Sequence, residues 1–261
     1  MSRQNYYKLR KQRIKVQIEE SFILSLVRGE RAVQPRMGGR KLFNVLTEEL
    51  KQNGVSIGRD RFFSVLSRNG LLIKRRARGC RTTNSRHWYD VYNNLLKDAC
   101  VCGPCQAVVS DITYIRTDEG FMYLSLVMDA YSRAILGYDC SDTLEAEGAL
   151  RSLSMATKQL KNSSGVIHHS DRGIQYCSTE YIRQLKIGGF RISMTETNHC
   201  YENSKAERLN GILKDEYGLG GRFLSKSDAR RAVAEAVMLY NYRRPHQALG
   251  YRYPMEVHMA A

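Results

Sequence analysis

Residues 166–173 read VIHHSDRG, and residues 203–214 read NSKAERLNGILK. In the first segment a short apolar run ends at a turn marked by Ser, Asp and Gly, so Asp171 is predicted to end a strand. The second segment predicts a helix, because apolar residues recur at spacings of three and four: Ala206, Leu209, Leu213 and Tyr217. Two acids, Asp171 and Glu207, therefore lie in contrasting local structures, with the 35 residues 172–206 between them.

The predicted helix carries a second stripe beside its apolar one. Glu207, Asn210 and Lys214 share a face, because residues three, four and seven apart lie on one side of a helix. This stripe would present a carboxylate, an amide and an ammonium group. The outermost two residues, Glu207 and Lys214, would lie about 10 Å apart along the helix axis. The plainer alternative is that Lys214 is a solvated lysine paired with Asp215 or Glu216.

A third acid stands in an upstream segment. Residues 107–115 are rich in β-branched residues and predict a strand with Asp111 in its middle. A buried carboxylate without a partner is costly, and three acids can converge only through tertiary folding. A shared divalent cation would offset their repulsion; Mg²⁺ suits a carboxylate site, with Mn²⁺ as the alternative.

The net charge of +15 is unevenly distributed. Residues 1–90 hold 21 Lys and Arg against 7 Asp and Glu, whereas residues 91–261 hold 20 against 19. Such segregation is typical of a nucleic-acid-binding region joined to a near-neutral domain, with a merely basic surface as the minor alternative.

The remaining composition is that of an ordinary globular protein. The 261 residues are 43% hydrophobic and 26% charged, enough for one large domain or two smaller ones. No apolar run approaches the length of a membrane span, so we expect no membrane association and a cytoplasmic location. Seven cysteines, an odd number, argue against a disulfide framework.

The first third of the chain predicts a small helical domain over residues 1–75. The expected helices cover residues 4–28, 40–50 and about 59–68, and residues 29–39, with Pro35, are expected to be a linker. Two short helices joined by a Gly-containing turn suit a helix-turn-helix unit, with Arg59 and Arg61 as DNA contacts. The alternative is a helical adaptor.

A basic connector follows this domain. Lys74, Arg75 and Arg76 begin it, and we expect them to contact phosphates. The linker itself is predicted to cover residues 76–105. Residues 106–261 are then predicted to form a separate core.

The core is predicted to be α/β, with a mixed five-stranded sheet flanked by helices. The expected strands are 107–116, 121–129, 133–140, 165–169 and 190–193, and the expected helices are 144–160, 179–187 and 227–242. Residues 243–261 are expected to be extended.

Other residues of the core and the linker are also candidate metal ligands. Asp129 ends a strand before a turn, which favours a structural role in accepting backbone N–H bonds. His168 and His169 face opposite sides of a strand, so we expect one packed histidine and one near DNA. Cys100, Cys102 and Cys105 lack the second ligand pair of a common zinc motif, which favours a linker that carries thiols over a zinc site.

Several motifs together resemble one family. DITY at 111–114, HSDRG at 169–173, the helix that carries Glu207 and YNYRRPHQAL at 240–249 are similar to second-frame, orfB-type insertion-sequence transposases. That resemblance covers nearly the whole chain. It implies a DDE catalytic core related to retroviral integrases, with a ribonuclease-H-like fold.

The resemblance also implies a function. Asp111, Asp171 and Glu207 would bind two Mg²⁺ ions and catalyse cleavage of the element's ends and DNA strand transfer. Residues near them would contact DNA: Arg172, Asn203, Asn210 and Lys214. The protein would act on bacterial nucleoid DNA as a homo-multimer in a synaptic complex, with a protein from an upstream frame as partner or frameshift fusion.

Two other functions remain open at this point. One is a hydrolytic ribonuclease-H-like nuclease, because the acids alone do not separate water from a 3′-hydroxyl as nucleophile. The other is a catalytically inactive DNA-binding regulator derived from a transposase.

Overall fold

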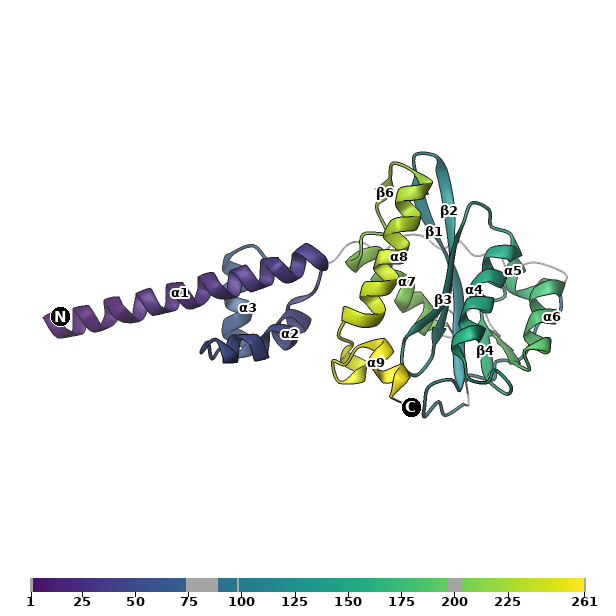
Figure 1. Ribbon diagram of the computed structural model, residues 1–261, viewed down its shortest axis with the longest axis horizontal. Coiled ribbons are helices and arrows are strands. Elements are labelled where there is room, and N and C mark those ends of the chain that lie inside the picture. The colour runs from purple at the N-terminus through teal and green to yellow at the C-terminus, as the bar shows by residue number, and fades with distance from the viewer. Residues whose placement is uncertain (1, 74–88, 98, 197–202, 261) are drawn as a thin grey trace. The chain divides into compact units, whose positions relative to one another are not determined.

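The computed structural model describes residues 2–73, 89–97, 99–196 and 203–260, and the chain divides into two compact units, residues 1–77 and 78–261 (Figure 1). The connector residues Lys74, Arg75 and Arg76 lie outside the described residues.

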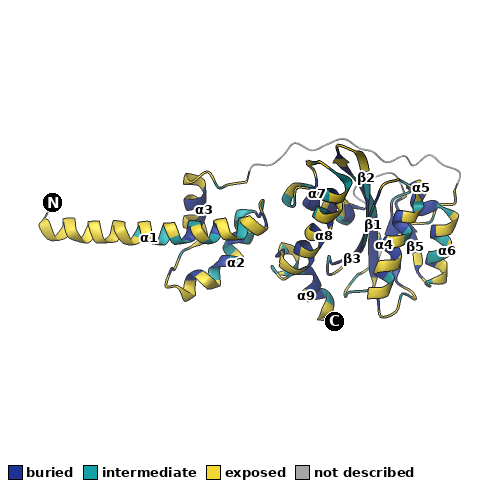
Figure 2. Ribbon diagram, turned by 45° about the horizontal axis from the view of Figure 1, so that its top comes forward, coloured by how far each residue is buried: buried dark blue, intermediate teal, exposed yellow. Residues whose placement is uncertain are grey.

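Three helices form the first unit: α1 (Arg3–Val33), α2 (Gly39–Gln52) and α3 (Arg59–Arg68). They share a small core: Ile23, Val27, Met37, Leu42, Leu46, Leu50, Val55, Phe62, Val65 and Leu66. The first half of α1 is exposed, as its colour in Figure 2 shows. The three helices therefore pack around one small apolar core.

The predicted linker at residues 29–39 is partly wrong, because α1 continues through Gly29 to Val33. A glycine inside a helix costs about 1 kcal/mol relative to alanine. Burial of Ile23 and Val27 in the core of the unit offsets that cost, so the helix ends only at the turn before Gly39.

The second unit is built on a mixed sheet in the order β3-β2-β1-β4-β5. Its strands are β1 (Ala107–Thr117), β2 (Gly120–Asp129), β3 (Ile135–Ser141), β4 (Ile167–Ser170) and β5 (Arg191–Met194). The pairs β1–β2 and β2–β3 are antiparallel, whereas β1–β4 and β4–β5 are parallel. All five predicted strands are therefore confirmed. A two-residue strand that was not predicted, β6 (Arg222–Phe223), adds to β1.

Helices cover both faces of this sheet (Figure 1). One face packs on α4 (Ala146–Gln159), α5 (Ile174–Cys177) and α6 (Thr179–Ile187), and the other on α7 (Ser204–Glu216) and α8 (Lys226–Arg243). Alternate residues of β1 serve the two faces, since Val108 packs on the first side and Val109 on the second.

The predicted extended tail is wrong in part. Residues 243–261 include a 3₁₀ turn at Gln247–Leu249 and a helix, α9 (Pro254–Met259). Pro254 is the first helical residue of α9, where its fixed φ and missing N–H are tolerated. Among the described helices, none combines the length and the apolar composition needed to cross a bilayer.

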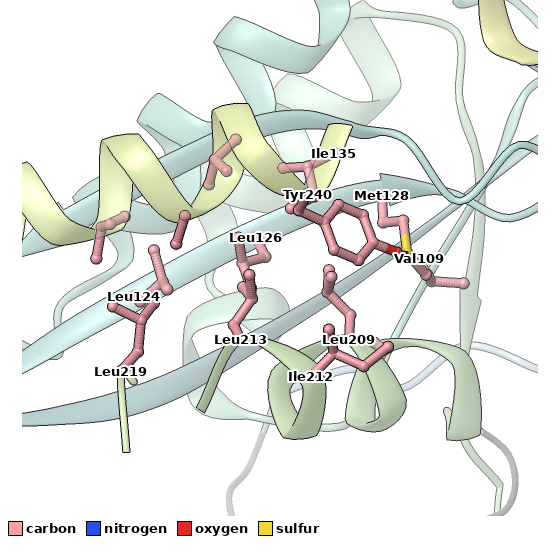
Figure 3. Close-up of a cluster of buried hydrophobic side chains, with 14 of the residues drawn as sticks. Val109, Leu124, Leu126, Met128, Ile135, Leu209, Ile212, Leu213, Leu219 and Tyr240 are labelled. Atoms are coloured by element: carbon pink, nitrogen blue, oxygen red, sulfur yellow. Dashed lines mark hydrogen bonds between the residues drawn. The ribbon is translucent and has the colours of Figure 1, made fainter. Parts of the chain in front are cut away.

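The apolar stripe of α7 is the part of the core that positions the acids. Leu209 and Leu213 point toward the sheet, where they meet Leu126 and the Tyr240 ring of α8 (Figure 3). Truncation of such a leucine to alanine typically costs about 2–5 kcal/mol. Because this stripe is fixed, the next face of α7 is turned toward Asp111 of β1, which Asn210 contacts.

Candidate active site

Asp111 lies on β1, and Asp171 directly follows β4, the neighbouring parallel strand. Val109 of β1 pairs with His169 of β4, and each aspartate lies two residues further along its own chain. A step of two residues keeps a side chain on the same face of a strand, and adjacent strands lie about 4.8 Å apart. The parallel register thus brings these two carboxylates together at one end of the sheet.

The Asp111 carboxylate is half-buried and is held by two donors. One oxygen, Oδ1, accepts the backbone N–H of Ile112 at 2.9 Å, and Oδ2 accepts the side-chain amide of Asn210 at 2.7 Å. The second bond ties α7 directly to β1. Both oxygens therefore have fixed directions.

The pKa of Asp111 is raised to about 8. Burial is the largest cause, the charge of Asp171 is the next one that raises it, and Glu207 adds a smaller effect; the Ile112 and Asn210 hydrogen bonds oppose the rise. Asp171 and Glu207, both remote from Asp111 in sequence, thus lie close enough to it in the fold to disfavour its ionisation.

The Asp171 side chain is half-buried and folds back on its own turn. Its Oδ1 accepts the N–H of Gly173 at 2.9 Å. A Cβ on Gly173 would lie 3.0 Å from the same oxygen, so glycine allows the backbone to approach the carboxylate this closely. The HSDRG turn is therefore a tight fit around Asp171.

Glu207 lies in the first turn of α7, and its side chain is exposed. A carboxylate at this position is stabilised by the positive end of the helix dipole. Burial of Ala206 and Leu209 on either side of it in sequence fixes the helix against the sheet, so Glu207 projects from a rigid element.

Lys214, two helical turns beyond Glu207 on the same stripe of α7, is half-buried. Burial lowers its pKa most, Asp111 raises it and Arg116 lowers it. Glu216, a partner considered from the sequence, is held instead by Arg244 through two bonds of 2.9 Å. Lys214 has no ion pair with any described residue, so the structure favours a cation near the acids over a paired surface lysine.

Two asparagines predicted to contact DNA face the sheet instead. Asn203 is 5% exposed and donates to the Ser110 carbonyl at 3.0 Å, and Asn210 is 8% exposed and donates to Asp111. Their amides are used to hold α7 and its N-terminus on β1. Arg172, a third predicted contact, is half-buried directly after Asp171.

The histidine prediction is wrong for one of the pair, since His168 and His169 are both fully buried. The Nε2 of His168 lies 2.8 Å from the Ser110 hydroxyl and 2.9 Å from the Tyr181 hydroxyl, and Nδ1 of His169 lies 2.8 Å from the Ser193 hydroxyl. Because neither ring has exposed surface, neither reaches the solvent.

Tyr176 is a residue near the acids that was not predicted from the sequence. It is buried in the short helix α5, and its hydroxyl has no hydrogen-bond partner among the described residues. Its pKa lies well above the usual value, first because of burial, then because of Tyr181, Asp111 and Asp171. A four-residue helix leaves no periodic pattern, so nothing local in the sequence placed this ring beside the acids.

In the first unit, Arg59 and Arg61 lie at the start of α3 and are exposed. Arg59 pairs with Asp60 at 3.0 Å, and Arg61 pairs with Glu19 of α1 at 3.2 Å. Both pairs involve an exposed guanidinium group, and ion pairs at a protein surface are weak.

Comparison with known proteins shows which family the chain resembles. The integrase core domain family matches residues 103–200 and again 188–254. The chain is 35% identical over 207 residues to the insertion element IS600 uncharacterized 31 kDa protein of Shigella sonnei, covering 78% of this chain and 76% of that protein. It is 37% identical, over 78% and 72% of the two chains, to the transposase InsF for insertion sequence IS3A of Escherichia coli.

A solved structure is similar in fold. The simian T-cell lymphotropic virus intasome, solved in complex with PP2A regulatory subunit B56 gamma, includes a chain that matches 85% of this chain and 74% of its own length with a TM-score of 0.51 and 18% identity. The second unit is thus a ribonuclease-H-like integrase core. The chain belongs to the insertion-sequence transposases that carry this core.

Proposed function

We propose that this protein cuts DNA at the ends of an insertion sequence and joins the freed ends to target DNA. The observation that carries the proposal is the effect of Asp171 and Glu207 on the ionisation of Asp111, since the three acids come from the end of β4, α7 and β1. A fold that places three carboxylates together needs a compensating positive charge.

The donor set fits a divalent cation. The three acids offer hard oxygen ligands. A cation would offset the charges of Asp171 and Glu207, which add to burial in raising the pKa of Asp111. Asp111, Asp171 and Glu207 would hold Mg²⁺ (or Mn²⁺). The chemistry that it supplies when bound is charge neutralisation on phosphate oxygens and a lower pKa for the attacking hydroxyl.

The two reactions differ only in the nucleophile. In cleavage, a water oxygen attacks the phosphorus, the bond to the 3′ oxygen breaks, and that oxygen leaves as a 3′-hydroxyl. In strand transfer, this hydroxyl loses its proton and attacks a target phosphodiester, so one phosphodiester forms as another breaks. The protein forms no covalent bond to DNA in either step.

Other residues of the second unit position this chemistry. Asn210 fixes the direction of one Asp111 oxygen, and Asn203 fixes the start of α7, so both act as positioning residues rather than as DNA contacts. Lys214 is proposed to neutralise a phosphate beside the cut, and Arg172 to contact DNA next to Asp171.

The first unit is proposed to bind DNA through its charge. Arg59 and Arg61 lie at the start of α3, the helix proposed to enter the major groove, and Lys74, Arg75 and Arg76 would contact phosphates beyond it. Two DNA ends have to be held together, so we propose that the protein acts as a multimer, with a protein from an upstream frame as a further partner.

A strand-transfer assay tests the proposal. Purified protein with Mg²⁺ and a pre-cut element end should yield a joined product, and Asp111→Asn should yield none. Cleavage without joining would favour the hydrolytic nuclease. Specific DNA binding without either reaction would favour the inactive regulator.

A further inference from the structure

We propose that Cys105, Asp129 and His258 form a Zn²⁺ site that is separate from the three acids. Their donor atoms, a thiol sulfur, a carboxylate oxygen and a ring nitrogen, all lie within 4.8 Å of one another. Cys105 Sγ lies 4.0 Å from His258 Nε2. Tetrahedral zinc, with bonds of about 2.3 Å to sulfur and 2.0 Å to nitrogen, sets these atoms about 3.6 Å apart, so a small side-chain movement completes the site.

The hydrogen bonds around His258 present the correct ring nitrogen. The Ser132 hydroxyl donates its one hydrogen to Asp129 Oδ1 at 2.8 Å, so toward His258 Nδ1, 3.3 Å away, it can only accept. The ring proton is thereby held on Nδ1, and the Nε2 lone pair is directed at Cys105. Metal-binding histidines are commonly oriented by a hydrogen bond of this kind.

Asp129 also keeps a free coordination position. Its Oδ1 accepts three hydrogens, from the N–H groups of Tyr131 and Ser132 and from the Ser132 hydroxyl, as its predicted structural role requires. Among the described residues, the N–H of Cys105, at 2.7 Å, is the one donor to its Oδ2. Oδ2 therefore has fewer donors than Oδ1 and is the oxygen that can bind a cation on the side of the thiol.

The chemical identity of the three ligands determines which metal the site favours. A thiolate and an imidazole favour zinc over the hard cations that suit the three acids. Asp129 is fully buried, whereas Cys105 and His258 are half-buried, so the site opens to solvent on one side. Three protein ligands therefore leave a fourth position, which water would fill.

Such an ion would join three remote parts of the second unit. Cys105 precedes β1, Asp129 ends β2, and His258 lies in α9. Cys105 has a φ of 61°, a left-handed conformation that is uncommon for residues other than glycine and clusters at ligand sites. We infer that zinc clips the C-terminal helix to the start of the sheet.

The nearby pair of cysteines offers a matched control. Cys100 and Cys102 are exposed, and their sulfurs lie 3.2 Å apart, yet neither belongs to the cluster of Cys105, Asp129 and His258. A double variant, Cys100→Ser with Cys102→Ser, removes two thiols of the same segment and leaves the proposed ligands intact.

The experiment measures metal in the full chain, without a histidine tag. Protein stripped with a chelator is given one equivalent of Zn²⁺, dialysed, and analysed by plasma mass spectrometry. In parallel, Co²⁺ is added and the thiolate-to-cobalt charge-transfer band is recorded. The parent protein and the double variant should retain one zinc per chain and show the band. Cys105→Ser should lose the band, and both Cys105→Ser and His258→Gln should bind zinc at least about tenfold more weakly.

Two results would overturn the proposal: zinc affinity unchanged in both single variants, or a cobalt band lost in the Cys100 and Cys102 double variant. Circular dichroism establishes that each variant is folded. If Cys105→Ser does not fold, His258→Gln alone decides, since its half-exposed side chain lies near the end of a short terminal helix. Because the readout is metal content, this test can fail or succeed independently of DNA cleavage.

Discussion

The two units of this protein divide charge and carboxylate chemistry between them. Residues 1–90 carry almost the whole excess of positive charge, and the three helices of the first unit enclose one small core. The second unit is nearly neutral, has an apolar cluster on each face of its sheet, and holds the three interacting acids. We propose that affinity for a polyanion and the chemistry performed on it belong to different parts of one chain.

This difference in charge between the two units predicts how variants should behave. Charge in the first unit acts at long range and is screened by salt, so its loss should weaken DNA binding in a graded way. The acids of the second unit act at bonding distance, so loss of one should remove the reaction and leave binding nearly intact. The predictions below test this separation.

The largest effect should come from the acids. Asp111→Asn, Asp171→Asn and Glu207→Gln should each lower the cleavage rate by about a thousandfold or more, equivalent to about 4 kcal/mol of transition-state stabilisation. Each change removes a negative ligand and almost no volume, so DNA affinity and folding should persist. Cleavage of a labelled element end, beside a filter-binding assay, measures both.

Asp139→Asn is the matched control, because Asp139 lies on β3 and pairs with Arg151 at 2.8 Å, away from the proposed site. It should cut DNA like the parent protein. Retained cleavage in any one of the three acid variants would remove that residue from the proposed triad.

A smaller effect should follow from the connector. Replacing Lys74, Arg75 and Arg76 by alanine should weaken binding to all DNA sequences and reduce the salt dependence of log K by about one unit for each lost phosphate contact. Cleavage at saturating protein concentration should be unchanged. Titrations at several salt concentrations measure the slope; an unaltered slope would show that this run is only a linker.

Within the second unit, Lys214 is expected to have a smaller effect on cleavage than the three acids. Lys214→Ala should lower end cleavage about tenfold and leave nonspecific DNA binding unchanged, and Lys214→Arg should keep part of the activity because the charge survives. Lys186→Ala, an exposed lysine of α6, serves as the control. Parental cleavage and joining by Lys214→Ala would leave Glu207 as the only site residue on that face.

The smallest effect concerns stability and pH. Burial, with a smaller effect of His169, lowers the pKa of His168 to about 3, against an ordinary value of 6.5. Between these values the unfolded state binds more protons, so the unfolding free energy falls as pH decreases below 6.5, by about 1 kcal/mol at pH 5.5. Urea titrations at pH 7.5 and 5.5 measure the loss, which His168→Gln should reduce. An equal loss in the variant would assign the acid sensitivity to other groups.

Much of the fold can be predicted from the sequence because it depends on local patterns of residues. Alternation and β-branched residues predict the strands that include Asp111 and Asp129, and the spacing of Leu209 and Leu213 predicts α7. The predictions that were wrong also rested on local patterns. Gly29 and Pro35 indicated a linker, but tertiary burial extended α1, and α5 and α9 are too short to show a period.

The sequence by itself determined which residues are candidates: three acids, an uneven charge and a helix with two stripes. Tertiary structure alone decided which of them meet. The parallel register of β1 and β4 sets Asp111 beside Asp171, the packing of α7 directs Asn210 at Asp111, and α9 brings His258 to Cys105. The physical reason is that periodicity reports which face of an element is buried, whereas contacts between remote elements depend on strand register and helix packing.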